Sequence, residues 1–187
     1  MEAFSDGVIA VIITIMVLEM RVPHGTDLGA LRATLPVFAV YLLSFVYLGI
    51  YWNNHHHLLY AAERIDGRTL WANLHLLFWL SLIPFTTGWM GENRFAAVPT
   101  AVYGGVLILA ALAYTILQRS LLAANGPDSV LARAIGSDVK GMVSIGLYAI
   151  AIGLAFVNQW ASLALYATNA ALWLVPDRRI ERLIARG

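Results

Sequence analysis

Six long apolar stretches run along the chain, and short polar segments separate them. A helix that crosses the hydrocarbon core of a bilayer needs about 20 consecutive, mostly apolar residues. The stretches that come near this length cover roughly residues 3–21, 36–60, 69–90, 96–121, 139–157 and 160–176. We therefore expect an all-α membrane protein in which residues 1–187 form a single unit of six transmembrane helices.

Prolines mark the ends of these stretches and interrupt one of them. Three prolines lie near predicted helix boundaries, where the missing amide is tolerated: Pro23, Pro36 and Pro99. Pro84 falls inside the third stretch, so we expect a kink there, with the hydroxyls of Thr86 and Thr87 bonding the freed carbonyls. After an Asn-Gly-Pro-Asp loop signal, residues 127–138 could form a short interfacial helix.

The composition is typical of a polytopic membrane protein. Hydrophobic residues make up 60% of the 187 residues and charged residues only 12%, whereas soluble domains have roughly 25% charged residues. The mean hydropathy is +0.72. The sequence contains no cysteine, which excludes disulfides, thiolate metal sites and cysteine nucleophiles. The first six residues lack the basic segment of a secretory signal peptide, so we do not expect a cleavable one.

Lysine and arginine residues are distributed unevenly between the predicted loops. With a cytoplasmic N-terminus, the cytoplasmic set is Arg64, Arg68, Arg119, Arg133, Lys140, Arg178, Arg179, Arg182 and Arg186. The external set is Arg21, Arg32 and Arg94. Nine of the 12 basic residues thus lie inside, and the positive-inside rule places both termini in the cytoplasm. Residues 177–187 form a basic cytoplasmic tail, which is either simply solvated or in contact with anionic lipid.

The first predicted helix is polar on one side and aliphatic on the other. On a helical wheel of about 100° per residue, Asp6 lies opposite Ile15, while Val11, Ile15 and Leu18 share one stripe with Thr14 at its edge. A carboxylate in a transmembrane helix is costly unless it is paired or functional. An aliphatic stripe ordinarily faces lipid or neighbouring helices. Opposite an anchored carboxylate, however, it favours a pore lined by several copies of this helix.

Two short motifs give the chain a family resemblance. The tripeptide Phe4-Ser5-Asp6 opens the first predicted helix, and a Trp-x-x-His-His pattern begins at Trp52 in the second. With both motifs in these positions, the chain resembles the short prokaryotic members of the endosomal/lysosomal potassium channel family known as transmembrane protein 175. The resemblance covers nearly the whole chain as one six-helix unit, and these two motifs are its specific part.

The resemblance implies a homotetramer in which the first helix of each subunit lines a central pore. Family members place three aliphatic rings on the pore face, at positions matched here by Val11, Ile15 and Leu18. Thr14 matches a position that often carries a hydroxyl. Val11 is shorter than the isoleucine or leucine that is commoner at the innermost ring. We therefore expect a wider first constriction and a larger role for Ile15.

The environment of Asp6 has two interpretations. Asp6 is either a solvated residue that caps the start of the helix, or an acceptor for donors on the second helix, namely Trp52, His55 or His56. The resemblance implies the second interpretation, because the family uses this cluster, together with Phe4 and Ser5, to fix the first helix around the pore. The family also carries an arginine six residues before the aspartate, and the present sequence starts too late to contain it. Either the natural N-terminus is longer, or Asp6 depends entirely on the second helix.

Glu19 lies about 40° from Ile15 on the helical wheel, close to the aliphatic stripe. A ring of such carboxylates could concentrate cations at the external mouth of a pore. Alternatively, Glu19 is an interfacial, solvated charge or pairs with Arg21, and we favour this second interpretation.

The three consecutive histidines His55, His56 and His57 do not predict a metal site. They point about 100° apart on a helix, whereas helical metal ligands are spaced as in His-Glu-x-x-His. The sequence also lacks a convincing nucleophile–base pair or carboxylate cluster. We therefore expect no metal, no cofactor and no catalytic residues, and hence no enzyme.

The sequence predicts a modestly potassium-selective cation channel in the plasma membrane of a prokaryote. A Thr-Val-Gly-Tyr-Gly filter is absent, so we do not expect selection by backbone carbonyls. The hydrophobic rings would instead form both constriction and filter for K⁺ and other monovalent cations. The expected partners are further copies of the chain and the lipid bilayer, with no nucleic acid. The alternative is a proton- or solute-coupled transporter that uses Asp6 and the histidines of the second helix.

Overall fold

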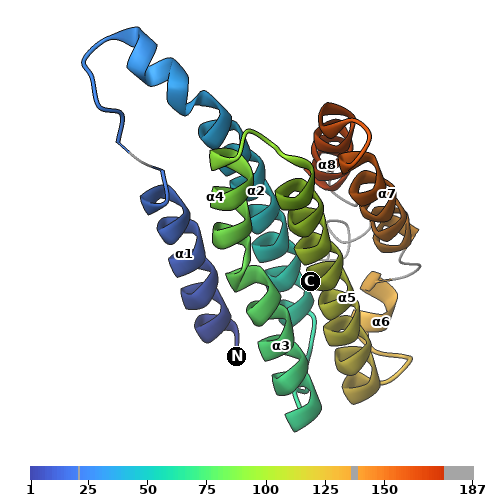
Figure 1. The fold of residues 1–187 in the computed structure, drawn as a ribbon. Coiled ribbons are helices and arrows are strands. Elements are labelled where there is room, and N and C mark those ends of the chain that lie inside the picture. The colour runs from blue at the N-terminus through green and yellow to red at the C-terminus, as the bar shows by residue number, and fades with distance from the viewer. Residues whose placement is uncertain (21, 136–138, 175–187) are drawn as a thin grey trace.

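The structure is a computed structural model that describes residues 1–20, 22–135 and 139–174. Within these residues all regular secondary structure is helical, without strands (Figure 1). The helices are α1 (Glu2–Leu18), α2 (Leu28–Tyr60), α3 (Gly67–Ser81), α4 (Ile83–Glu92), α5 (Ala97–Asn125), α6 (Val130–Ile135), α7 (Val139–Ala155) and α8 (Gln159–Leu174).

Helix α1 lies at one edge of the bundle, and α7 and α8 lie at the opposite edge (Figure 1). Helix α1 packs against α2, α3 and α4, whereas α5 packs against α3, α4 and α7. Because α1 is peripheral, one side of it is left without a neighbour in the single chain.

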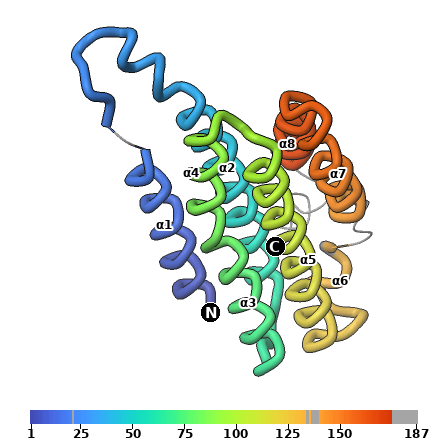
Figure 2. The backbone as a smooth tube through the Cα atoms, viewed as in Figure 1, coloured from blue at the N-terminus to red at the C-terminus, as the bar shows by residue number. Residues whose placement is uncertain are grey.

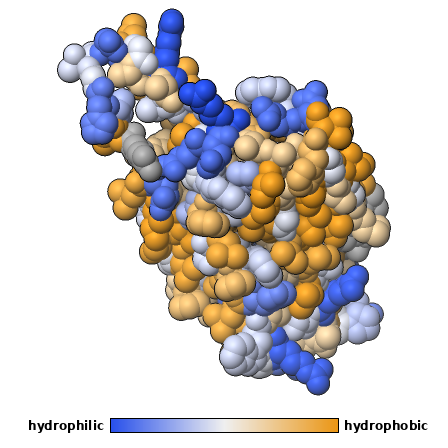
Figure 3. All heavy atoms as spheres, in the orientation of Figure 1, coloured by the Kyte–Doolittle hydropathy of each residue, from blue (hydrophilic) through white to orange (hydrophobic). Residues whose placement is uncertain are grey.

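Three helical stretches among the described residues are long and apolar enough to cross a membrane: Leu28–Tyr60, Gly67–Glu92 and Ala97–Asn125. Lys140–Ala155 is a shorter apolar helix. In the space-filling view, hydrophobic side chains cover the middle of the visible face, and hydrophilic side chains gather toward its ends (Figure 3). This distribution suits a bundle whose middle lies in hydrocarbon.

The third predicted span is broken, as the position of Pro84 predicts. Helix α3 ends at Ser81 and α4 begins at Ile83, so Pro84 occupies the first turn of α4, where its missing amide is tolerated. The Oγ1 of Thr86 donates to the carbonyl of Leu82 (3.2 Å) or of Ile83 (3.1 Å) and not to that of Leu80, which is the carbonyl that Pro84 leaves without a helical donor. The hydroxyl of Thr87 bonds the buried hydroxyl of Ser44 on α2 at 2.7 Å. The prediction that these two hydroxyls bond freed carbonyls was therefore wrong.

The second helix starts earlier than predicted. Its N-cap is Asp27, whose Oδ1 accepts the backbone N–H of Ala30 at 2.7 Å. Pro36 therefore lies inside α2 and does not mark its start. The first turns of α2 project beyond the other helices (Figure 2). Water can reach the backbone there, so the carbonyl that a proline leaves without a donor is solvated at little cost.

Two other predicted segments lie partly or wholly outside the described residues. The short helix expected within residues 127–138 is present as α6, which covers only Val130–Ile135. The basic tail, residues 177–187, lies outside the described residues, as does Arg21.

Buried hydroxyl groups join α2, α5 and α8 in the interior. Tyr47 donates to the carbonyl of Tyr166 at 2.6 Å, and Tyr166 donates in turn to the carbonyl of Thr100 at 3.1 Å. The hydroxyls of Ser44 and Tyr103 are 3.0 Å apart. Polar groups in an apolar interior require partners of this kind, so these bonds fix how α8 sits on α5 and α2.

The start of α3 is capped by Asp66, which lies outside the apolar stretch. Its Oδ1 accepts the backbone N–H of Thr69 at 2.8 Å and the Thr69 hydroxyl at 2.7 Å. The bond from the backbone N–H, followed by that from the hydroxyl, lowers the pKa of Asp66 below its ordinary value. This cap therefore depends on the ionised carboxylate.

Candidate functional site

Helix α1 presents two different faces. Ser5, Ile9, Ile12 and Met16 are buried against the bundle, and their spacing of three and four residues places them on one side of a helix. Val11, Ile15 and Leu18 are 55%, 42% and 80% exposed. The aliphatic stripe predicted from the sequence is thus the side of α1 that the single chain leaves uncovered.

This exposed face forms one wall of an open groove of about 1240 Å³ between α1 and α4. The wall from α1 includes Phe4, Gly7, Val11, Ile15 and Leu18, and the wall from α4 includes Pro84, Phe85, Gly88 and Trp89. Phe4, which is 58% exposed, points away from the core. The three predicted ring positions therefore border one apolar hollow.

The two polar residues beside the stripe are also accessible. The Oγ1 of Thr14 donates to the carbonyl of Val11 at 2.9 Å, which uses its hydrogen and leaves its oxygen lone pairs free to accept. Glu19 is exposed and borders the groove close to Gly88. Arg21, the alternative partner of Glu19, lies outside the described residues.

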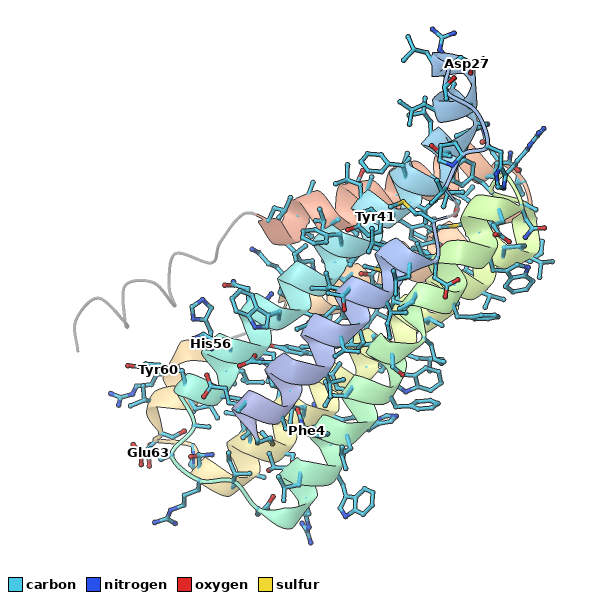
Figure 4. The ribbon with its side chains drawn as sticks, turned by 90° about the vertical axis from the view of Figure 1, so that its left-hand side faces the viewer. Phe4, Asp27, Tyr41, His56, Tyr60 and Glu63 are labelled. Carbon is cyan, nitrogen blue, oxygen red and sulfur yellow. The ribbon has the colours of Figure 1, made fainter. Side chains whose placement is uncertain are left out.

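On the side facing α2, two carboxylates of α1 meet two rings. The Trp52 indole Nε1 donates to Oδ1 of Asp6 at 3.0 Å, and Nδ1 of His56 lies 2.9 Å from Oε1 of Glu2. The Trp52 and His56 rings are stacked, with centroids 6.1 Å apart. Phe4 and His56 mark this end of the bundle, and Asp27 marks the other (Figure 4). We call Glu2, Asp6, Trp52 and His56 the α1–α2 clamp.

His55 belongs to a separate, buried network. Its Nε2 lies 2.8 Å from Oδ1 of Asn73 on α3, and Nδ2 of Asn73 donates to Oγ of Ser5 at 2.9 Å. Ser5 donates to the carbonyl of Met1 at 3.1 Å. Because Asn73 presents its oxygen to His55, the imidazole carries its hydrogen on Nε2. Of the three donors considered for Asp6, the structure pairs only Trp52 with it, while His55 and His56 have other partners.

Sequence reasoning missed Glu2 and Asn73. Glu2 and Asp6 are four residues apart, as are Trp52 and His56, so each pair lies on one helix face. That matching spacing was a usable signal for Glu2. Asn73 stands out only as a lone amide in an apolar stretch, and its partner could not be inferred without the rotation of α3. Among the described residues, no group of three histidine, aspartate or glutamate side chains could hold a metal.

The apolar middle, the polar contacts between helices and the uncovered stripe of α1 define a multi-pass helical membrane protein. A model of the family described as "Endosomal/lysosomal potassium channel TMEM175" matches residues 1–84. The chain is also 50% identical over 182 residues to a protein named potassium channel from Chryseobacterium sp. (strain P1-3), covering 97% of this chain and 95% of that protein. The chain belongs to the TMEM175 family, a family of channels and not of enzymes.

Two other relatives are similar to this chain in sequence or structure along most of its length. A protein named potassium channel from Streptomyces collinus is 34% identical over 182 residues, covering 90% of this chain and 87% of that protein. The crystal structure of a lysosomal potassium-selective channel TMEM175 homolog from Chamaesiphon minutus matches with a TM-score of 0.80 and 29% identity. That match covers 93% of this chain and 94% of the homolog.

Proposed function

We propose that four copies of this chain form a modestly potassium-selective cation channel in the plasma membrane of a prokaryote. Each chain would cross the bilayer six times, through α1, α2, the α3–α4 pair, α5, α7 and α8, with both termini in the cytoplasm. The two relatives that are named potassium channels support K⁺ as the permeant ion. The observation that carries the proposal is the exposed stripe of Val11, Ile15 and Leu18 on α1, opposite the α1–α2 clamp.

An assembly is required by this mechanism because a single helix cannot enclose a pore. The clamp holds the back of α1 against α2 of its own subunit. The uncovered aliphatic front is then available to surround an axis together with the fronts of three other subunits. The open groove beside this front is consistent with a surface that further copies of the chain cover.

In the proposed pore, selection follows from the cost of removing water. Apolar rings offer no replacement for the hydration shell, and narrow ones can dewet and close the pore. K⁺ gives up water more readily than Na⁺, so apolar rings favour K⁺ to a modest degree. The free lone pairs of Thr14 would offset part of this cost. Glu19, which is exposed beside the groove, would lie at the external mouth as a solvated charge, and a ring of four such carboxylates there would also attract cations.

The test substitutes an amide into the stripe. Ile15→Asn is expected to wet the constriction, raise K⁺ flux into liposomes by about tenfold, equivalent to about 1.4 kcal/mol of barrier, and weaken discrimination against Na⁺. Leu18→Asn should have a comparable or smaller effect. Ile13→Asn is the control, because Ile13 packs against the core and its substitution should reduce stability without wetting the pore.

The same liposomes separate the proposal from a coupled transporter. Native mass measurement first establishes that each variant is still a tetramer, and proton flux is recorded beside K⁺ and Na⁺ flux. If tetramers with Asn at position 15 or 18 keep unchanged K⁺ and Na⁺ fluxes, the pore does not run along this face. Proton flux coupled to a second solute would favour the transporter.

A further inference from the structure

A small cavity lies on the side of the bundle away from α1, where α2, α5, α7 and α8 meet (Figure 1). Its volume is about 40 Å³, and its wall is largely aromatic, with Tyr51 from α2, Tyr114 from α5, Tyr148 from α7 and Trp173 from α8. The Tyr51 and Tyr114 rings meet edge to face, with centroids 6.2 Å apart. Among the described residues, the lining includes none of the proposed ring positions. The cavity is therefore separate from the proposed ion path.

The Tyr51 hydroxyl on this wall has no hydrogen-bond partner among the described residues. The residue is only 9% exposed. Two other polar side chains of the wall are bonded: Tyr114 donates to the backbone carbonyl of Asn54 at 3.2 Å, and the Trp173 indole donates to Oγ of Ser144 at 2.7 Å. A buried hydroxyl that lacks a partner costs free energy, and buried polar groups are nearly always bonded. The Tyr51 hydroxyl is therefore expected to find its partner inside the cavity that it borders.

Asn54 places an acceptor on the same wall. Tyr51 and Asn54 are three residues apart on α2, so their side chains share one face of the helix. Nδ2 of Asn54 donates to the carbonyl of Ile50 at 2.8 Å, whereas Oδ1 accepts no hydrogen bond from the described part of the chain. Because the cavity is small, this acceptor and the O–H donor of Tyr51 are within reach of one small molecule. A hydroxyl group complements both, since it can accept from Tyr51 while it donates to Asn54.

The charge around the cavity favours a neutral occupant. Its lining contains no acidic or basic side chain among the residues that the structure describes. The Nζ of Lys140 lies 5.9 Å from the centroid of the Trp173 ring, where it would repel a cation. Burying an ion without an opposite charge is costly, and the wall offers none. A cavity of about 40 Å³ has room for about three water molecules, or for a compound of about four non-hydrogen atoms.

We propose that this cavity is a binding site for a small neutral hydroxyl compound, of the size of a short-chain alcohol, held by Tyr51 and Asn54. The hydroxyl of the compound bridges the Tyr51 O–H and Oδ1 of Asn54, and its short carbon chain lies against the aromatic rings, where it is removed from water. A ligand of about four non-hydrogen atoms binds with a Kd on the order of 1 mM. The bound compound contacts α2, α5 and α7 together, so its binding stabilises the folded protein.

The probe is 2-bromoethanol, because its bromine quenches tryptophan fluorescence on contact and Trp173 borders the cavity. The purified protein in detergent is titrated with 2-bromoethanol and, separately, with bromoethane, which lacks the hydroxyl. The wild type is expected to show saturable quenching by 2-bromoethanol, in addition to the linear collisional quenching of exposed residues such as Trp71. Tyr51→Phe should weaken the saturable binding of 2-bromoethanol about three- to tenfold, the value of one hydrogen bond, and leave that of bromoethane unchanged. Asn54→Leu should have the same selective effect.

Tyr60→Phe is the matched control, because Tyr60 also lies on α2 but is 71% exposed and is not part of the cavity wall. Its titration should equal that of the wild type. Purely linear quenching of the wild type, which is the result expected if the cavity holds only water, overturns the inference.

Two further outcomes also overturn it. Saturable quenching that persists in Trp173→Phe would place the binding elsewhere, and equal affinity of the wild type and Tyr51→Phe for 2-bromoethanol would show that apolar contact alone holds the compound. If Asn54→Leu does not fold, Tyr51→Phe decides, since it removes a single oxygen and keeps the ring. These titrations do not depend on ion flux, so the proposed channel function stands or fails separately, on the flux of Ile15→Asn.

Discussion

At the scale of single residues, adjacent histidines have different surroundings and different partners. His55 is fully buried and bonded to Asn73 on α3, whereas His56 is half-exposed and faces Glu2 on α1. Consecutive residues on a helix point about 100° apart, so one turn of α2 contacts two helices. Asp6 completes the arrangement with the Trp52 indole. The polar groups at the start of α1 thus fix its position relative to both α2 and α3.

We expect Asp6→Ala to destabilise the protein before it changes ion preference. A hydrogen bond to a charged group contributes about 1.5–3 kcal/mol, and partial exposure of Asp6 places the loss near the lower end. Asp6→Asn keeps an acceptor for Trp52 and should lose less. The free energy of unfolding, measured in detergent, should be highest for the wild type, lower for Asp6→Asn and lowest for Asp6→Ala. A stable Asp6→Ala tetramer whose only defect is an altered K⁺ to Na⁺ ratio would contradict this assignment.

At the scale of helices, the packing of α5 against α8 depends on a close approach of the Tyr166 side chain to the backbone at Gly104. A Cβ atom at Gly104 would fall on the Tyr166 hydroxyl, and would lie 2.8 Å from Cγ1 of Ile152 on α7. The same hydroxyl donates to the carbonyl of Thr100. Gly104 therefore permits both the packing of α5 against α7 and α8 and one of their interior hydrogen bonds.

Gly104→Ala is therefore expected to lower the free energy of unfolding by about 1–3 kcal/mol, the usual cost of overpacking an interior. The adjacent Gly105 is the control, because a Cβ there meets open space, and Gly105→Ala should leave stability unchanged. Thermal unfolding of both variants in the same detergent measures the difference. Equal stability of the two variants would show that the contact with Tyr166 relaxes without cost.

The cap of α3 predicts a dependence on pH. The pKa of Asp66 is lowered in the folded protein by the bonds from Thr69, so the cap contributes stability above the ordinary carboxyl pKa. That contribution is lost as the pH falls through the lower, folded value. Asp66→Asn keeps a capping oxygen but does not titrate. The stability difference between wild type and this variant, measured by unfolding between about pH 2 and 6, should shrink toward the acid end. A constant difference would argue against the cap.

At the scale of the whole molecule, the sequence predicted what depends on local pattern. The length of the apolar stretches predicted the long helices, and Pro84 predicted the break between α3 and α4. The prediction that α2 starts at Pro36 was wrong, because a proline inside a projecting, solvated part of a helix costs little free energy. The stripe on α1 could be predicted because it follows from helical periodicity alone. The partners of His55 and His56 could not, since they depend on how α3 and α1 are rotated against α2.

The exposed stripe positions on α1 lie close together along the helix, and this spacing affects how the membrane potential would act on an ion in the proposed pore. Val11 and Leu18 are seven residues apart, so at 1.5 Å per residue the three proposed rings span about 10 Å along the helix. The hydrocarbon core is about 30 Å thick. An ion in the proposed pore would leave bulk-like water for only about a third of its path. The transmembrane field would then fall mainly across the rings, where moving one charge through 100 mV is worth about 2.3 kcal/mol. The side chains that set the dehydration barrier would thus also set the voltage dependence of the current.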